Sequence, residues 1–180
     1  MKKIFIFCLS AMVLLVIGVK STFALAPSLN FTVSSPAAQK VDYVLPYPGI
    51  LPDHPLYALK MVRDRIMDWL IKDPVKKTEF LILMADKRIG AAKALFDGNK
   101  PELGLTTALK AVAYQERAID SFAKAQQAGG NTNGLKDKLK NSTKKQIEIL
   151  EEIITKAPAT TKQGLQYALD KSNKNLSSIN

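Results

Sequence analysis

The chain has 180 residues, of which 47% are hydrophobic and 23% charged, and its formal net charge is +10. This length and composition fit one packed domain with short flanking segments. A single cysteine and a single histidine argue against a disulfide framework, a Cys/His zinc site and a histidine-based catalytic triad. The basic balance favours anionic partners such as lipid head groups, acidic cell-wall polymer or nucleic acid.

The amino terminus has the layout of a secretory signal peptide. Lys2 and Lys3 precede an apolar run over residues 4–19, and small residues follow that run. Thr22 and Ala24 satisfy the small-x-small rule, which predicts cleavage after Ala24 and a secreted or extracytoplasmic protein. The run is shorter than the about 20 apolar residues of a membrane span. Retention of the leader as an uncleaved membrane anchor is the alternative.

A proline-rich stretch over residues 45–57 follows a flexible linker that we place at residues 25–42. Its prolines exclude a helix and favour extended or turn geometry. Pro48 and Gly49 fit a type II turn, and Asp53 is a good N-cap for the helix that follows. We expect the tyrosines of this proline strip to pin it against the helices, because aromatic side chains anchor packing.

Two amphipathic helices are predicted next, over residues 55–71 and 74–97. Apolar residues of the first recur at spacings of three and four, which places them on one face that we expect to pack on the core. These residues are Leu56, Leu59, Val62, Ile66, Trp69 and Leu70. Arg88 lies close to the broad apolar face of the second helix. This position predicts a partly buried pair between Arg88 and a carboxylate of another helix.

Further helices are expected over residues 101–128 and 135–157, with a short helix and a frayed tail after Pro158. The breaks between successive helices are short, so neighbours in sequence should pack antiparallel. We predict an all-α fold, an antiparallel bundle of three to four long helices plus a short C-terminal helix, preceded by a proline-rich extended segment. In this division residues 1–24 are the signal peptide, residues 43–128 the core domain, and residues 129–180 a C-terminal helical extension and tail.

No arrangement of catalytic residues stands out, so we expect no enzyme activity, no metal site and no cofactor. His54, beside a helix start, is interpreted as a turn or capping residue. The candidate binding residues are Tyr47, Tyr57 and Trp69, as parts of an aromatic ligand site. A hydrophobic ligand slot is a second reading, although such stripes are usually core. It would be lined by Trp69, Met61, Met67 and Met84.

Three motifs follow one another along the chain. They are Pro-Gly-x-x-Pro-x-x-Pro-Leu-Tyr-x-Leu-Lys, Lys-Lys-x-Glu and Ala-Asp-Lys-Arg. The matching residues are Pro48, Gly49, Pro52, Pro55, Leu56, Tyr57, Leu59, Lys60, Lys76, Lys77, Glu79, Ala85, Asp86, Lys87 and Arg88. Together, over roughly residues 43–122, they resemble an uncharacterised helical domain family, a domain of unknown function found in exported bacterial proteins. The resemblance implies export and helices, and it implies no activity.

The function we expect is that of a non-enzymatic exported module that binds or spaces components of the cell envelope. Its charge favours an anionic envelope polymer or a lipid surface as the partner. The alternative is a carrier of a small hydrophobic ligand or haem in the helical core. Nucleic-acid binding by the lysine-rich residues 136–145 is the weakest option, because no aromatic side chains interleave there. A homo-oligomer is compatible with the sequence.

Overall fold

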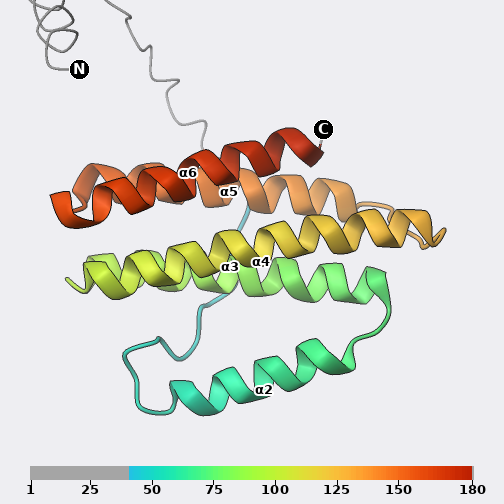
Figure 1. Ribbon diagram of the computed structural model, residues 1–180, viewed down its shortest axis with the longest axis horizontal. Helices are drawn as coiled ribbons and strands as arrows, with labels where there is room; N and C mark the ends of the chain where they lie inside the picture. Colours follow the sequence, from blue (N-terminus) through green and yellow to red (C-terminus); the bar gives the residue numbers. More distant parts are fainter. Residues whose placement is uncertain (1–40, 180) are drawn as a thin grey trace, which may run out of the picture. The chain divides into compact units, whose positions relative to one another are not determined.

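The computed structural model describes residues 41–179, so the predicted signal peptide and most of the linker lie outside the described residues. Within this range the chain forms helices and no strand, which confirms the predicted all-α fold. The helices are α2 (Tyr57–Leu70), α3 (Pro74–Asp97), α4 (Pro101–Gln127), α5 (Leu135–Lys156) and α6 (Ala159–Ile179) (Figure 1).

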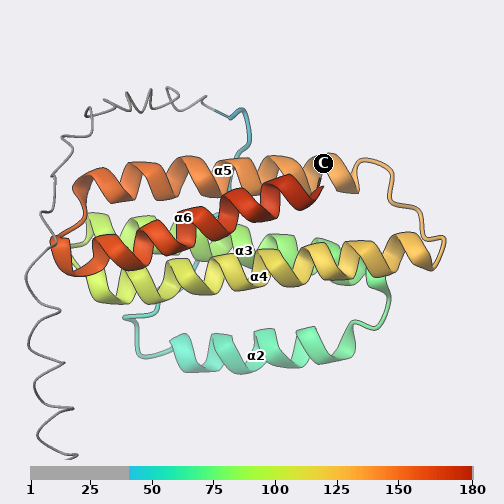
Figure 2. The same cartoon turned by 45° about the horizontal axis from the view of Figure 1, so that its top comes forward.

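Helices α3 to α6 form an antiparallel bundle of two hairpins. Helix α3 packs along α4, and α5 packs along α6. Contacts of α4 with α6 and of α3 with α5 join the two hairpins. Helix α2 lies on the α3–α4 side of the bundle, away from α6 (Figures 1 and 2). It is therefore a fifth helix added to one face of a four-helix bundle.

Local signals set the start of α3 as predicted. The Asp73 carboxylate accepts a hydrogen bond of 2.8 Å from the Lys76 N–H, and Pro74 occupies the first helical position. The Asp73 side chain satisfies a backbone N–H that would otherwise have no partner. Proline suits the first helical position because the N–H that it lacks would have no partner within the helix.

The start of α2 differs from the prediction. The helix begins at Tyr57, and Asp53 does not cap it. The Asp53 carboxylate pairs instead with the Lys100 ammonium at 2.5 Å, before α4. The His54 Nδ1 accepts a hydrogen bond from the Leu56 N–H, which agrees with a turn or capping role. A tertiary ion pair has thus replaced the local cap.

The core lies between the two hairpins and draws on all four bundle helices. One cluster includes Ile89, Ala92, Ala108, Val112, Leu150 and Leu165. A second includes Leu81, Ile82, Phe122, Leu139 and Ile179. Because α5 and α6 supply part of both clusters, the region expected as an extension shares one core with α3 and α4.

Helix α6 is longer than the short helix and frayed tail expected, since it continues to Ile179. Ser172, Asn175 and Ile179 are buried on its inner side. The Gln146 amide of α5 donates a hydrogen bond of 3.0 Å to the Ser172 hydroxyl. The polar composition of residues 171–180 suggested that the end of the chain frays. Its polar side chains Ser172 and Asn175 are instead buried, and Ser172 bonds to Gln146 of α5.

Gly104 is a close-packing position of α4. A Cβ at this residue would lie 2.6 Å from Cδ2 of Phe96 in α3. We expect Gly104→Ala to lower the free energy of unfolding by about 1–3 kcal/mol, as over-packing does, despite the higher helix propensity of alanine. Urea unfolding followed by circular dichroism measures the change. Adding Phe96→Leu should recover part of the loss, and a more stable single variant would contradict the prediction.

Candidate functional site

Helix α2 carries its apolar face on the outside. The six residues predicted to pack on the core do share one face, but that face points away from the bundle. Leu59, Val62 and Trp69 are 68%, 58% and 69% exposed. We call this surface the outer face of α2, formed by Leu56, Leu59, Val62, Ile66, Trp69 and Leu70. The prediction that these residues are buried is therefore wrong.

The side of α2 that faces the bundle is largely polar, which explains the reversal. It consists of Tyr57, Met61, Asp64 and Asp68, again at spacings of three and four. Asp64 is buried and pairs with Arg63 of α2 itself. Tyr57 and Asp68 have their partners on α3 and α4. Such partners offset the cost of burying a polar group.

Arg88 of α3 is the centre of the contact with α2. Its guanidinium donates to the Tyr57 hydroxyl at 2.5 Å and contacts the Met61 sulfur at 3.2 Å. It also lies 5.1 Å from the centre of the Tyr114 ring of α4 and 5.9 Å from that of Tyr57. The predicted, partly buried pair of Arg88 with a carboxylate is wrong: Arg88 is buried, and these groups hold it in place of a carboxylate. Two tyrosine faces supply the negative potential that a carboxylate would have supplied.

Asp68 ties the other end of α2 to both α3 and α4. Its carboxylate pairs with Lys77 at 2.6 Å and with Arg117 at 2.7 Å. Burial opposes ionisation of Asp68, but the hydrogen bonds from Lys77 and Arg117 outweigh it and lower the pKa of the carboxyl. Between these ends, Asp64 Oδ2 and Arg88 Nε are buried and have no hydrogen-bond partner among the described residues. The contact between α2 and the bundle is thus a polar one.

Cations flank the outer face on both edges. On one side an open groove of about 430 Å³ separates α2 from the proline strip, and we call it the proline-side groove. Its lining combines Ile50, Leu56 and Leu59 with Lys60, Arg63 and Lys87. On the opposite edge a second open groove has a volume of about 360 Å³. Its lining includes Trp69 and three cations, Arg65, Lys72 and Lys77, together with one carboxylate, Asp68. The Lys72 ammonium lies 5.1 Å from the centre of the Trp69 ring.

Lys60 gives the first motif of the chain a structural role. Its ammonium donates to the carbonyls of Pro48 and Ile50, at 2.8 and 3.0 Å. Gly49 between them has a φ of 72°, the left-handed conformation that a type II turn needs at this position. Burial lowers the pKa of Lys60. The Lys60 side chain thereby holds the turn against α2 and shapes one wall of the proline-side groove.

A buried polar network anchors the chain at Tyr43, just before the proline strip. The Asp86 carboxylate of α3 accepts hydrogen bonds from the Tyr43 hydroxyl at 2.7 Å and from the Ser142 hydroxyl of α5 at 2.6 Å. The buried Gln115 of α4 donates to the Leu139 carbonyl at 3.3 Å. Burial raises the pKa of Asp86 and outweighs the hydrogen bonds from Ser142 and Tyr43. The network joins three helices to Tyr43 and is enclosed, so we assign it a structural role.

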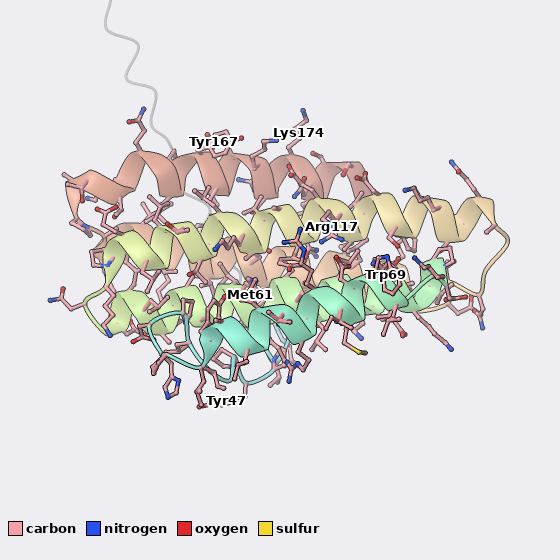
Figure 3. All side chains as sticks on the ribbon, turned by 60° about the horizontal axis from the view of Figure 1, so that its bottom comes forward. Tyr47, Met61, Trp69, Arg117, Tyr167 and Lys174 are labelled. Carbon is pink, nitrogen blue, oxygen red and sulfur yellow. The ribbon has the colours of Figure 1, made fainter. Side chains whose placement is uncertain are left out.

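The three candidate binding residues do not form one site. Tyr47 is 82% exposed on the proline strip, whereas Tyr57 points inward to Arg88. Trp69 lies on the outer face, toward the far end of α2 from Tyr47 (Figure 3). The predicted methionine slot is also absent among the described residues, because Met61 faces Arg88 and Met84 is buried within α3.

Of the residues singled out by the motifs, Pro48, Gly49 and Leu56 line the proline-side groove. Pro52 and Pro55 lie in the turns before α2, and Asp86 and Arg88 hold the strip and α2. Sequence reasoning missed the cations that border the outer face. One signal could have revealed these cations. Asp64 and Asp68 lie on the side of α2 opposite the apolar stripe, so the helix has no acidic residue near the stripe to balance the cations there.

The sequence profile of a domain of unknown function, DUF5667, matches residues 49–160. The chain belongs to this family. The match begins in the proline strip, covers α2 to α5 and ends in the first residues of α6. It confirms the resemblance to an uncharacterised domain family. Comparisons with curated proteins and with solved structures gave no match.

None of the helices within residues 41–179 is both long and apolar enough to cross a membrane. The same residues contain no group of three or more His, Cys, Asp or Glu side chains placed to hold a metal ion. The outer face of α2 with its two cationic edges is the candidate functional site.

Proposed function

We propose that the protein is an exported, non-enzymatic module that binds an anionic surface of the cell envelope through the outer face of α2. One observation carries the proposal: a helix with a continuous apolar stripe is held on the bundle by its polar side, with the stripe outward. Exposed apolar patches of this kind usually mark interaction sites in soluble domains. The predicted signal peptide supports export.

The arrangement of charge around α2 supports an anionic partner. Both aspartates of the helix face the bundle, where Asp68 is bound by two cations and Asp64 by Arg63. The cations at the edges are more accessible: the Arg63 side chain is 65% exposed, and Lys87 of α3 has no ion-pair partner among the described residues. A partner that approaches the outer face therefore meets positive charge first, and an anionic partner is attracted.

The carrier alternative has less support from this geometry. Its candidate slot residues point in different directions, and the centre of the bundle is filled by fully buried side chains, apolar ones together with Gln115, Ser142 and Thr143. Both grooves beside α2 are open to the surface. We therefore place the binding site outside the bundle.

The test is sedimentation of the protein with isolated bacterial envelope fragments. We expect binding at low ionic strength and release as salt rises, because the screening length falls from about 10 Å at 0.1 M to about 3 Å at 1 M. Ile66→Asp on the outer face should weaken binding. Tyr167→Asp is the matched control, since Tyr167 is 57% exposed on α6, on the other side of the bundle (Figure 3). Binding that ignores both salt and Ile66→Asp would overturn the proposal.

A further inference from the structure

The outer face of α2 needs an apolar medium as well as negative charge. Its six large apolar residues form a stripe along a helix of 14 residues, which at about 1.5 Å per residue is about 21 Å long. A soluble anionic polymer satisfies cations but offers little apolar volume. A lipid bilayer offers both, because its acyl chains lie directly beneath a layer of phosphate groups.

The edges of the stripe match the layered chemistry of that interface. Trp69 and Lys72 lie side by side on one edge, an amphipathic ring beside a cation. Tryptophan and lysine concentrate where head groups meet acyl chains, because each has an apolar part and a polar end. On the opposite edge, Arg63 and Lys87 border the proline-side groove. A helix lying flat in the interface would place both edges at phosphate depth.

The proline-side groove has the lining expected for a single anionic head group. Three cationic side chains, Lys60, Arg63 and Lys87, face a wall formed by Ile50, Leu56 and Leu59. Lys60 donates to the two turn carbonyls. Arg63 donates to Asp64 through Nε and Nη2, which leaves its Nη1 without a partner among the described residues. Lys87 has no ion-pair partner within the described part of the chain. A volume of about 430 Å³ lies in the range of ligand sites, which is about 300–1,000 Å³.

A second copy of the chain fits the outer face less well. Two outer faces packed together would bring the cationic edges of both copies close to each other, since the aspartates of α2 are turned toward the bundle. Like charges at an interface oppose association. The charge pattern therefore favours a negatively charged occupant over a copy of the same surface.

Resting on the proposed function, we infer that the anionic surface is a lipid bilayer: α2 lies flat in its interface, with the outer face among the acyl chains and a lipid phosphate in the proline-side groove. Lys87 and Arg63 bind the phosphate, Lys60 forms the wall behind it, and Trp69 with Lys72 anchors the other edge.

The chain contains one tryptophan, so Trp69 fluorescence reports on α2 alone. The experiment uses protein purified from a bacterial periplasm, with its amino terminus determined by intact mass. Vesicles of phosphatidylglycerol should shift Trp69 emission to the blue, and vesicles of phosphatidylcholine should not. Any retained leader would be present in every variant and would leave the comparison of Trp69 spectra intact.

Substitutions then test the two parts of the site. Lys87→Gln and Arg63→Gln should each weaken vesicle binding about 5-fold, the effect of one interfacial cation. Ile66→Asp should weaken it about 10-fold or more, because it removes an apolar contact and adds negative charge. Lys174→Gln, on α6, is the charge-matched control and should leave binding unchanged (Figure 3).

The outcomes separate this inference from the proposed function. Binding to envelope fragments that depends on Ile66, without binding to phosphatidylglycerol vesicles, overturns the lipid partner and leaves the proposed function standing. Loss of both overturns both. Vesicle binding that is indifferent to Lys87→Gln and Arg63→Gln overturns the head-group site. Binding of glycerol 3-phosphate without vesicles assigns the groove to a soluble phosphate, and a dimer dissociated by Ile66→Asp assigns the outer face to a second copy.

Discussion

Asp86→Ala should lower the free energy of unfolding by about 2–4 kcal/mol. The Asp86 carboxylate accepts hydrogen bonds from Tyr43 and Ser142, and alanine would leave both hydroxyls without this acceptor. Ser142 is fully buried, so leaving its hydroxyl without an acceptor costs more free energy than leaving that of Tyr43. Each buried polar group left unsatisfied costs about 1–3 kcal/mol. Urea unfolding followed by circular dichroism measures the difference.

Asp86→Asn is the matched variant and should retain most of the stability, because the amide oxygen can still accept one hydroxyl. Asp120→Ala, at an exposed position in the interior of α4, is the surface control and should change stability by less than about 0.5 kcal/mol. A stability of Asp86→Ala equal to that of the surface control would show that the network contributes nothing.

The same position predicts a pH dependence of stability. Burial raises the pKa of Asp86 in the folded protein above its value in the unfolded chain. The folded state therefore binds this proton more tightly, and the stability it contributes is fully present below the unfolded pKa of about 3.9. That contribution is lost as pH rises through the folded pKa. Asparagine does not titrate, so the Asp86→Asn variant should gain stability relative to the parent as pH rises.

Urea unfolding of both proteins between about pH 3 and pH 7 measures this difference. Other titrating groups act in both proteins and cancel when the two curves are subtracted. A difference that stays flat, or that moves in favour of the parent with rising pH, would contradict the raised pKa of Asp86.

The second large effect is expected for Arg88→Ala, which should lower the free energy of unfolding by about 2–3 kcal/mol. The variant loses a charged hydrogen bond to Tyr57 and the stacking on Tyr57 and Tyr114. Such a hydrogen bond contributes about 1.5–3 kcal/mol and each stacking contact about 0.5–2 kcal/mol. The net loss of stability is smaller than the sum of these contributions, because the variant no longer has to desolvate a buried cation.

The position of the effect is more informative than its size. Arg88 joins α2 to the bundle, so amide hydrogen exchange should rise in α2 and change little in α3 to α6. Arg65→Ala removes an exposed arginine of α2 and is the matched control. Uniform loss of protection in all helices would show that Arg88 supports the whole bundle, and an unchanged melting temperature would show that its contacts are dispensable.

The local parts of the fold could be predicted because their signals are local. Asp73 and Pro74 begin α3 through bonds within one turn, and Gly98 ends it. Where a distant residue competes for the same group, prediction from sequence fails. Asp53 was expected to cap α2. Its carboxylate pairs instead with the ammonium of Lys100, which is distant in sequence.

For the candidate site, periodicity predicted which residues of α2 share a face, and it could not predict the direction of that face. An apolar stripe usually points to the core because burial there is favourable. Here the opposite side of the helix has specific partners, with Tyr57 on Arg88 and Asp68 between two cations. These partners belong to α3 and α4 and are brought together by the packing of those helices. The sequence of α2 alone carries no information about them.

The sequence by itself determined the helical class, the family and most helix boundaries, because composition, periodicity and caps act over a few residues. Only the tertiary structure decided which side of α2 meets solvent and what surrounds Arg88. Both depend on groups brought together from separate helices, and the energy of a buried polar group is fixed by those neighbours.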